Sequence, residues 1–146
     1  MADLVASSLT EADANLIIAA FLHDVVEDTP TTNPEVAERF GPDVAALVGE
    51  VTDDKSLPKA ERKRLQIESA PKKSKRTQSI KIADKISNLR AILDSPPTDW
   101  DVQRKKEYFV WAKQVVDGFT APNEVLKAEF EKIFQEFDKR FLTDFQ

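Results

Sequence analysis

The sequence contains no cysteine, three glycines and a single histidine among its 146 residues. Without cysteine there can be no disulfide and no thiolate ligand for a metal. No stretch approaches the roughly 20 apolar residues that a membrane-spanning helix needs. Residues 1–13 also lack the basic segment and apolar run of a secretory signal. These absences predict a soluble, cytoplasmic protein that does not act at a membrane.

The length of 146 residues and a hydrophobic content of 41% suit one domain built around one core. Few glycines and little alternation of apolar and polar residues argue against β-sheet. Apolar residues instead recur at helical spacing through most of the chain. The expected fold is therefore all-α, an array of roughly seven helices given typical helix lengths.

Capping residues and prolines place the ends of these helices. Thr10 is the expected cap of the first helix, residues 29–32 break it, and residues 71–75 are expected to form a polar loop. The last helix carries an aromatic stripe that we interpret as core or partner interface. The expected helices cover about residues 11–28, 33–41, 42–51, 56–70, 79–93, 99–119 and 123–141.

The only histidine lies at the polar end of an apolar run, within residues 23–29 (HDVVEDT). His23 followed directly by Asp24 puts a nitrogen ligand and an oxygen ligand for a divalent transition metal at one point. Glu27 lies four residues after His23 and Asp28 four after Asp24, so on a helix each pair shares a face. A solvated helix end is the alternative reading, although acids at a helix C-terminus oppose its dipole.

A second acidic position follows sixty residues after Asp24, at Asp84 in an otherwise apolar and basic stretch. Asn88 lies four residues further on the same expected helix, so it shares a face with Asp84. A His-Asp pair followed by a distant Asp is the skeleton of an HD-type phosphohydrolase.

The net charge of −5 hides an uneven distribution. Residues 55–85 contain eleven basic and three acidic residues, a local balance of +8, which leaves −13 for the rest of the chain. A basic segment on an acidic protein favours a local anion site over general nucleic-acid affinity. A solvated helix face would also account for most of these lysines. RNA binding through residues 59–76 is a third hypothesis, but no aromatic residues are interleaved there to stack on bases.

Several segments together resemble the hydrolase domain of the RelA/SpoT homologues. The segments that carry this resemblance are residues 23–29, 40–41 (FG), 51–55 (VTDDK) and 81–90 (KIADKISNLR). Residues 57–64 (LPKAERKR) and 107–109 (EYF) are most similar to the small stand-alone metazoan members of that family. The resemblance covers nearly the whole chain.

The resemblance implies an HD-domain helical array that removes the 3′-pyrophosphate from guanosine tetra- and pentaphosphate with bound Mn²⁺. It implies removal of the 2′-phosphate of NADPH as a further activity. By resemblance, His23, Asp24 and Asp84 are metal ligands, and Glu27 and Asp28 are the catalytic acids. Mn²⁺ accepts imidazole and carboxylate together, so the residue types fit these roles.

The resemblance also places Lys59, Asn88, Trp100, Arg104 and Tyr108 around the nucleotide. Lys59 and Arg104 can neutralise phosphate oxygens, and Tyr108 can stack on a base or ribose. A phosphorylated nucleotide is the expected partner, with no nucleic acid and no membrane. The sequence does not predict the oligomeric state.

The family pattern contains a further metal-ligating histidine on a helix ahead of Thr10, and this sequence has no histidine before His23. We therefore expect residues 1–146 to form a single HD-type hydrolase domain that lacks the family's N-terminal helices. The competing hypothesis is a nucleotide-binding relic that has lost full metal binding and has little or no activity.

Overall fold

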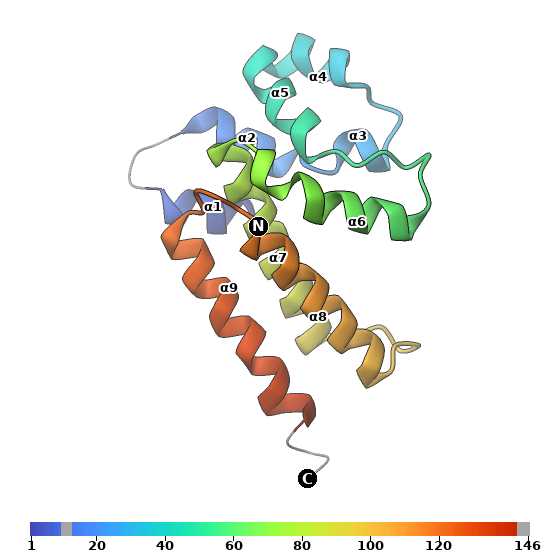
Figure 1. Cartoon of the computed structure of the whole chain (residues 1–146). Helices are drawn as coiled ribbons and strands as arrows, with labels where there is room; N and C mark the ends of the chain where they lie inside the picture. The colour runs from blue at the N-terminus through green and yellow to red at the C-terminus, as the bar shows by residue number, and fades with distance from the viewer. Residues whose placement is uncertain (10–12, 143–146) are drawn as a thin grey trace.

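The computed structural model describes residues 1–9 and 13–142, with the side chains of residues 141 and 142 excepted. All regular structure in this part of the chain is helical (Figure 1), which confirms the predicted all-α class. The α-helices are α1 (Ala2–Ser8), α2 (Ala14–Phe21), α3 (Val25–Asp28), α4 (Asn33–Phe40), α5 (Pro42–Val51), α6 (Lys59–Ser69), α7 (Lys75–Asp94), α8 (Val102–Asp117) and α9 (Glu124–Phe137). Two short helices, η1 (Ala70–Lys72) and η2 (Asp138–Leu142), complete the described elements.

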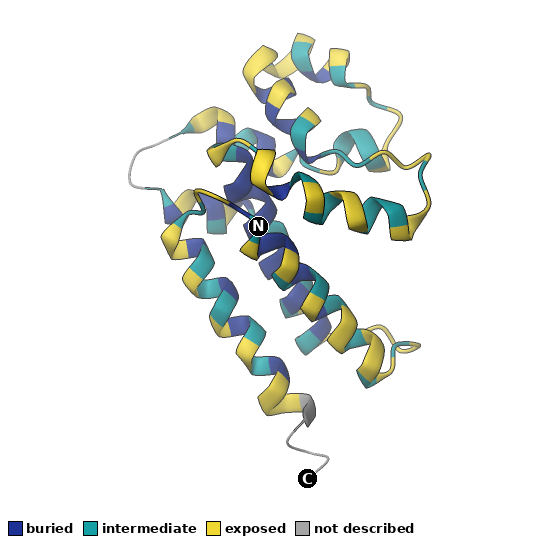
Figure 2. Ribbon diagram, in the orientation of Figure 1, coloured by how far each residue is buried: buried dark blue, intermediate teal, exposed yellow. Residues whose placement is uncertain are grey.

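Helix α7 organises the fold. It packs against α1, α2, α5, α8 and α9, and it is the longest described helix at 20 residues. Figure 2 shows buried positions on the inward faces of the surrounding helices and exposed positions on their outward faces. No helix in the described residues is both long and apolar enough to span a membrane.

The aromatic stripe of the last helix belongs to the core, as one of the two predicted readings had it. Phe130 and Phe137 are buried, and the ring of Phe137 lies 4.8 Å from that of Phe109 on α8. Phe134 is half-buried beside them, and the side chain of Phe141 lies outside the described residues. The apolar face of α9 therefore closes the core against α7 and α8.

The single helix expected over residues 11–28 is wrong, because α2 ends at Phe21 and α3 begins at Val25. The side chain of His23 supplies the physical reason. Its Nδ1 lies 2.8 Å from the carbonyl oxygen of Ala20, which in a continuing helix would accept the N–H of Asp24. A side chain bonded to that carbonyl favours the break. The expected cap Thr10 lies outside the described residues, and Asp13 caps α2 instead.

The break changes the electrostatics of the acidic residues that follow it. Glu27 and Asp28 lie in the single turn of α3, which ends at Asp28. The dipole of one long helix over residues 11–28 therefore does not act on them, and a helix of one turn has little dipole of its own.

Helix α7 begins four residues earlier than the sequence predicted. The hydroxyl of Ser74 accepts the N–H of Thr77 and caps a helix that starts at Lys75. Part of the expected loop over residues 71–75 is the short helix η1. The basic helix α6 begins at Lys59, where residue 56 was expected.

Arg76 at the start of α7 holds two other helices in place. Its guanidinium donates to Asp13 at the cap of α2 and to Asp43 in the first turn of α5, at 2.8–3.0 Å. Hydrogen bonds from Arg76 lower the pKa of both carboxyls, that of Asp43 to about 2. Planar guanidinium forks suit such paired carboxylate contacts.

Replacing Arg76 with methionine is expected to lower the urea midpoint of unfolding at pH 7. Because the folded pKa values of the two aspartates lie below their unfolded values, their contribution is present above about pH 3.8 and fades as the pH falls towards 2. The difference between the urea midpoints of wild type and Arg76→Met should therefore shrink as the pH falls from about 3.8 towards 2. Lys75→Met, at an exposed neighbouring position, is the control. Equal midpoints for the wild type and Arg76→Met at pH 7 would show that the pairing contributes nothing.

Candidate active site

The structure brings His23 and Asp24 together with Asp84, although Asp84 comes from the middle of α7. The Nε2 of His23 lies 2.9 Å from Asp24 Oδ2 and 3.4 Å from Asp84 Oδ1. Neighbouring ligands on one metal with bonds of 2.0–2.2 Å are separated by about 3 Å. The predicted convergence of these three side chains is therefore present, with His23 between the two carboxylates.

The orientation of these side chains leaves ligand atoms available. His23 Nδ1 faces the carbonyl of Ala20, so a neutral imidazole would carry its proton there and leave the Nε2 lone pair free. Asp24 occupies the N-cap position of α3 but makes no capping hydrogen bond. An aspartate at that position normally caps its helix, and here the carboxylate faces His23 instead.

The charges of the three groups depend on one another. The pKa of His23 is raised, chiefly by its hydrogen bond to Asp84. Asp24 is closer to the ring, but it is half exposed, so water screens its charge more. Burial raises the pKa of Asp24. Burial also acts to raise that of Asp84, but the hydrogen bond from His23 and the charge of Lys85 outweigh it, and the pKa of Asp84 lies below its usual range.

In metal-free protein, Asp84→Asn is expected to lower the pKa of His23 towards its ordinary value. The substitution removes the acceptor that favours the imidazolium, whereas Asp24→Asn should have a smaller effect because Asp24 is more exposed. The chain has one histidine, so its proton NMR signal can be followed across pH in the presence of a chelator. A pKa of His23 unchanged in Asp84→Asn would contradict this account.

The donors fit a divalent metal in kind and in pairwise spacing. An imidazole nitrogen and carboxylate oxygens are ligands that such ions accept together. Within residues 1–9 and 13–142, however, no three His, Cys, Asp or Glu side chains are already arranged as a group around one metal position. His23, Asp24 and Asp84 would hold the ion only after small side-chain adjustments, because Nε2 now faces the two carboxylates directly.

The two acids of α3 differ in their surroundings. Burial first, and then the charge of Asp53, raise the pKa of Glu27. Asp28 instead lies at the surface, where its carboxylate accepts a hydrogen bond from Lys55 at 2.9 Å. Glu27 is thus the more buried of the two acids and the one with a raised pKa.

A cavity of about 220 Å³ opens beside Asp84, between α6, α7 and α8. Three of the five predicted nucleotide contacts, Lys59, Asn88 and Tyr108, line it. Asn88 donates to the hydroxyl of Tyr108 at 3.0 Å, and burial raises the pKa of that hydroxyl to about 12. The neutral phenol is therefore the form present near pH 7.

The other two predicted contacts lie at the edge of this cavity. Trp100 packs against Tyr108 with ring centroids 5.8 Å apart, and the guanidinium of Arg104 lies over the Trp100 ring at 4.3 Å. Neither lines the cavity itself. They can contact a nucleotide only where it extends past Tyr108.

Comparison with known proteins identifies the fold. Residues 1–113 match the model of the HD domain. The chain belongs to the HD-domain family.

Named relatives and solved structures agree with this membership. A guanosine-3′,5′-bis(diphosphate) 3′-pyrophosphohydrolase MESH1 of Drosophila melanogaster is 52% identical over 124 residues, 85% of this chain and 69% of that protein. The human protein of the same name is 48% identical over the same shares. A solved metazoan ortholog of SpoT that hydrolyzes ppGpp matches with a TM-score of 0.87 and 48% identity, over 92% of this chain and 76% of that one.

Family membership implies that the protein uses a divalent metal. The site also contains residues that the sequence did not single out. Lys85 is buried, its Nζ lies 4.3 Å from the Trp111 ring, and burial lowers its pKa to about 8. Lys63 lies over the same ring at 5.0 Å. Trp111 lies three residues after Tyr108, so helical spacing on α8 could have indicated it.

Proposed function

We propose that this chain is a metal-dependent phosphohydrolase that removes the 3′-pyrophosphate from guanosine 3′,5′-bis(diphosphate), with Mn²⁺ as the metal. The observation that supports this is the cluster of His23, Asp24 and Asp84, whose Asp84 also lines a cationic cavity with two aromatic residues. The substrate of this proposal is taken from the activities for which the metazoan relatives are named. One continuous core supports a single catalytic domain over the described residues.

The cavity has the charge that a pyrophosphate requires. Lys59, Arg62, Lys63 and Lys85 line it, against the carboxylates of Asp53 and Asp84. Burial lowers the pKa of Lys63, and the charges of Lys59 and Arg104 lower it further. Cations that repel one another in a partly buried site are relieved by a polyanion.

The aromatic residues of the cavity suit the nucleoside. Tyr108 and Trp111 stand 5.3 Å apart, centroid to centroid, at a steep interplanar angle of 61°. Either ring offers a face for a base, and Asn88 supplies an amide for hydrogen bonding beside them. Lys63 approaches both rings, which positions a phosphate-binding cation next to the base-binding wall.

We assign the chemical roles as follows. His23, Asp24 and Asp84 would hold the metal, which when bound supplies Lewis-acid activation of water and phosphate. Glu27 takes or orients a proton of the attacking water. Lys59 and Lys63 hold the phosphate oxygens. The water oxygen bonds to phosphorus as the P–O3′ bond breaks, and the proton taken by Glu27 passes to the 3′-oxygen, which leaves as a hydroxyl.

The decisive experiment measures pyrophosphate released from guanosine 3′,5′-bis(diphosphate), and phosphate released from NADPH, with added Mn²⁺ or Mg²⁺. It uses the 146-residue chain and a version extended by an N-terminal helix with a histidine in the family's position. We expect pyrophosphate release by the extended version, and its loss in His23→Ala. Binding of the nucleotide without hydrolysis by either version would favour the non-catalytic relic. If phosphate release from NADPH is faster than pyrophosphate release from the guanosine nucleotide, NADPH is the better substrate of this site.

A further inference from the structure

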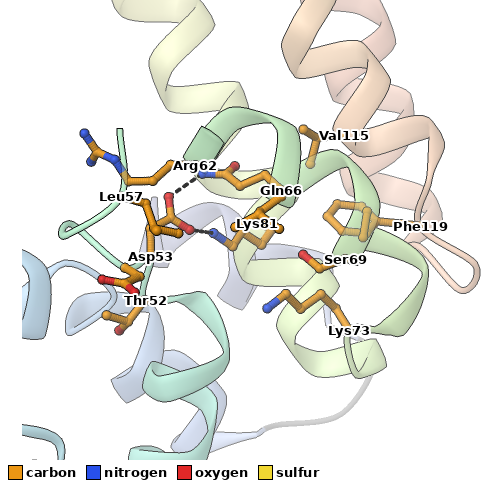
Figure 3. A pocket seen from close by; sticks show the side chains of 13 residues that line it. Thr52, Asp53, Leu57, Arg62, Gln66, Ser69, Lys73, Lys81, Val115 and Phe119 are labelled. Atoms are coloured by element: carbon orange, nitrogen blue, oxygen red, sulfur yellow. Dashed lines mark hydrogen bonds and ion pairs between the residues drawn. The ribbon is translucent and has the colours of Figure 1, made fainter. Parts of the chain in front are cut away.

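A second cavity, of about 260 Å³, lies between α6, α7, α8 and the segment that follows α5 (Figure 3). It is slightly larger than the nucleotide cavity and shares Asp53, Arg62 and Gln66 with it. The remaining lining residues are different, so it is a separate space. None of the roles assigned above uses it.

Two lysines bring positive charge to this cavity. Lys73 donates to the backbone carbonyl of Glu50, and Lys81, whose side chain is only 9% exposed, donates to the carbonyl of Val51 at 3.2 Å. An ammonium has three N–H donors, so these bonds leave further donors on each. Burial, and then the charge of Lys81, lower the pKa of Lys73.

The opposite wall is apolar. Val115 and Phe119 come from α8 and its C-terminal end. Figure 3 shows them on one side of the view, with the side chain of Lys73 below Phe119, Asp53 on the opposite side and Lys81 between. Leu65 adds an exposed apolar side chain from α6. A ligand that fits both walls needs a charged head and an apolar body.

The net charge of the side chains that line this cavity indicates the charge of the ligand's polar group. The cationic lining residues are Lys73, Lys81 and Arg62, and the anionic ones are Asp53 and Asp54, which leaves one net positive charge. Arg62 lines both cavities, and its buried Nε lacks a hydrogen-bond partner in the described part of the chain. A single negative charge would balance the site.

We propose that this cavity binds a small monoanionic carboxylate with an apolar body. Its carboxylate lies between Lys73 and Lys81, and its body packs against Val115 and Phe119. Binding does not depend on the proposed hydrolase activity.

Ligand binding in this cavity would alter the surroundings of His23, Asp24 and Asp84 through the hydrogen bonds of Gln66. Its amide donates to Asp53, and its Oε1 accepts from Lys85 at 3.0 Å. Lys85 in turn lies 3.8 Å from Asp84. The Nζ of Lys81 lies 3.9 Å from Asp53. An anion bound to Lys81 would compete with Asp53 for this ammonium, and Asp53 is the carboxylate that accepts the hydrogen bond from Gln66. That path couples the cavity to the cluster at His23.

The test uses benzoate and hexanoate as probes, with benzyl alcohol as the neutral counterpart. Ligand-observed NMR and calorimetry measure their binding. We expect a Kd near or below ~1 mM for the carboxylates and binding at least ~10-fold weaker for the alcohol. Lys73→Met should weaken the carboxylates by a similar factor. Lys72→Met, at an exposed position outside the cavity, should leave the affinity unchanged.

Three outcomes overturn the proposal. The first is no binding of the carboxylates up to ~10 mM, and the second is equal binding of benzyl alcohol. The third is loss of binding in Lys59→Met with retention in Lys73→Met, a result that would place the probe in the nucleotide cavity. Thermal unfolding of each variant checks its folding. Should Lys73→Met unfold, Ser69→Trp fills the same cavity without a charge change and must also abolish binding.

The coupling has its own readout, because the imidazole signal of the only histidine is unambiguous. Benzoate should shift that signal in the wild type and leave it in place in Gln66→Met. A shift that persists in Gln66→Met would remove Gln66 from the path.

Discussion

Replacing Glu27 with alanine is expected to lower kcat by about 10²–10⁴-fold in an active form of the protein, with its metal content unchanged. Glu27 lies in the first turn of α3, one turn beyond Asp24, where it can reach an attacking water without being a metal ligand. Burial and the Asp53 carboxylate raise its pKa. A raised pKa makes it a better proton acceptor near neutral pH.

The measurement pairs steady-state kinetics with elemental analysis of the purified variants. Asp28→Ala should also lower kcat, but less, because Asp28 is 58% exposed and is paired with Lys55. Glu35→Ala, at an exposed acid in the first turn of α4, is the matched control. Full activity in both Glu27→Ala and Asp28→Ala would remove these acids from the mechanism.

The pH dependence of kcat provides a second check on Glu27. Its carboxylate is the active form, and its folded pKa lies above the ordinary 4.5. The rate should therefore fall as the pH drops through a value above 4.5, and this limb should be absent from the residual activity of Glu27→Gln.

Mn²⁺ is expected to bind the 146-residue chain weakly, and hydrolysis by this chain should be slow. The chain supplies one imidazole, at His23, and an imidazole is the more metal-selective of the two donor types in the cluster. Without the metal, the raised pKa of His23 and of Asp24 means that protons compete for the same donor atoms.

Adding an N-terminal helix that carries a histidine should raise the affinity for Mn²⁺ at least ~10-fold, since even outer-shell changes cost that much. It should raise kcat as well. Competition against a fluorescent chelator measures the affinity, and the same helix with alanine in place of that histidine is the control. Tight binding of one equivalent of manganese by the 146-residue chain, with turnover equal to that of the extended version, would show that the metal needs no histidine besides His23.

Local sequence signals were sufficient for the class of the fold and for many helix ends. Thr32 and Asn123 cap α4 and α9 because a short polar side chain can accept the free N–H groups of the first turn. Helix α8 begins later than the expected residue 99, at Val102, and its cap is Asp101. The apolar stripe of α9 identified its buried face, because helical periodicity can be read directly from the sequence. The His-Asp pair and the distant Asp84 could also be recognised as residue types suited to a metal.

Tertiary structure decided what the pattern could not. The chain breaks at His23 because its ring bonds a backbone carbonyl, an event that an apolar run does not reveal. Lys81 and Lys85 looked like solvated lysines, yet α7 is packed on several sides and both are buried. Gln66 and Asp53 acquire their place between two cavities only when α6 lies over α7, because contacts between residues distant in the chain depend on packing and not on local periodicity.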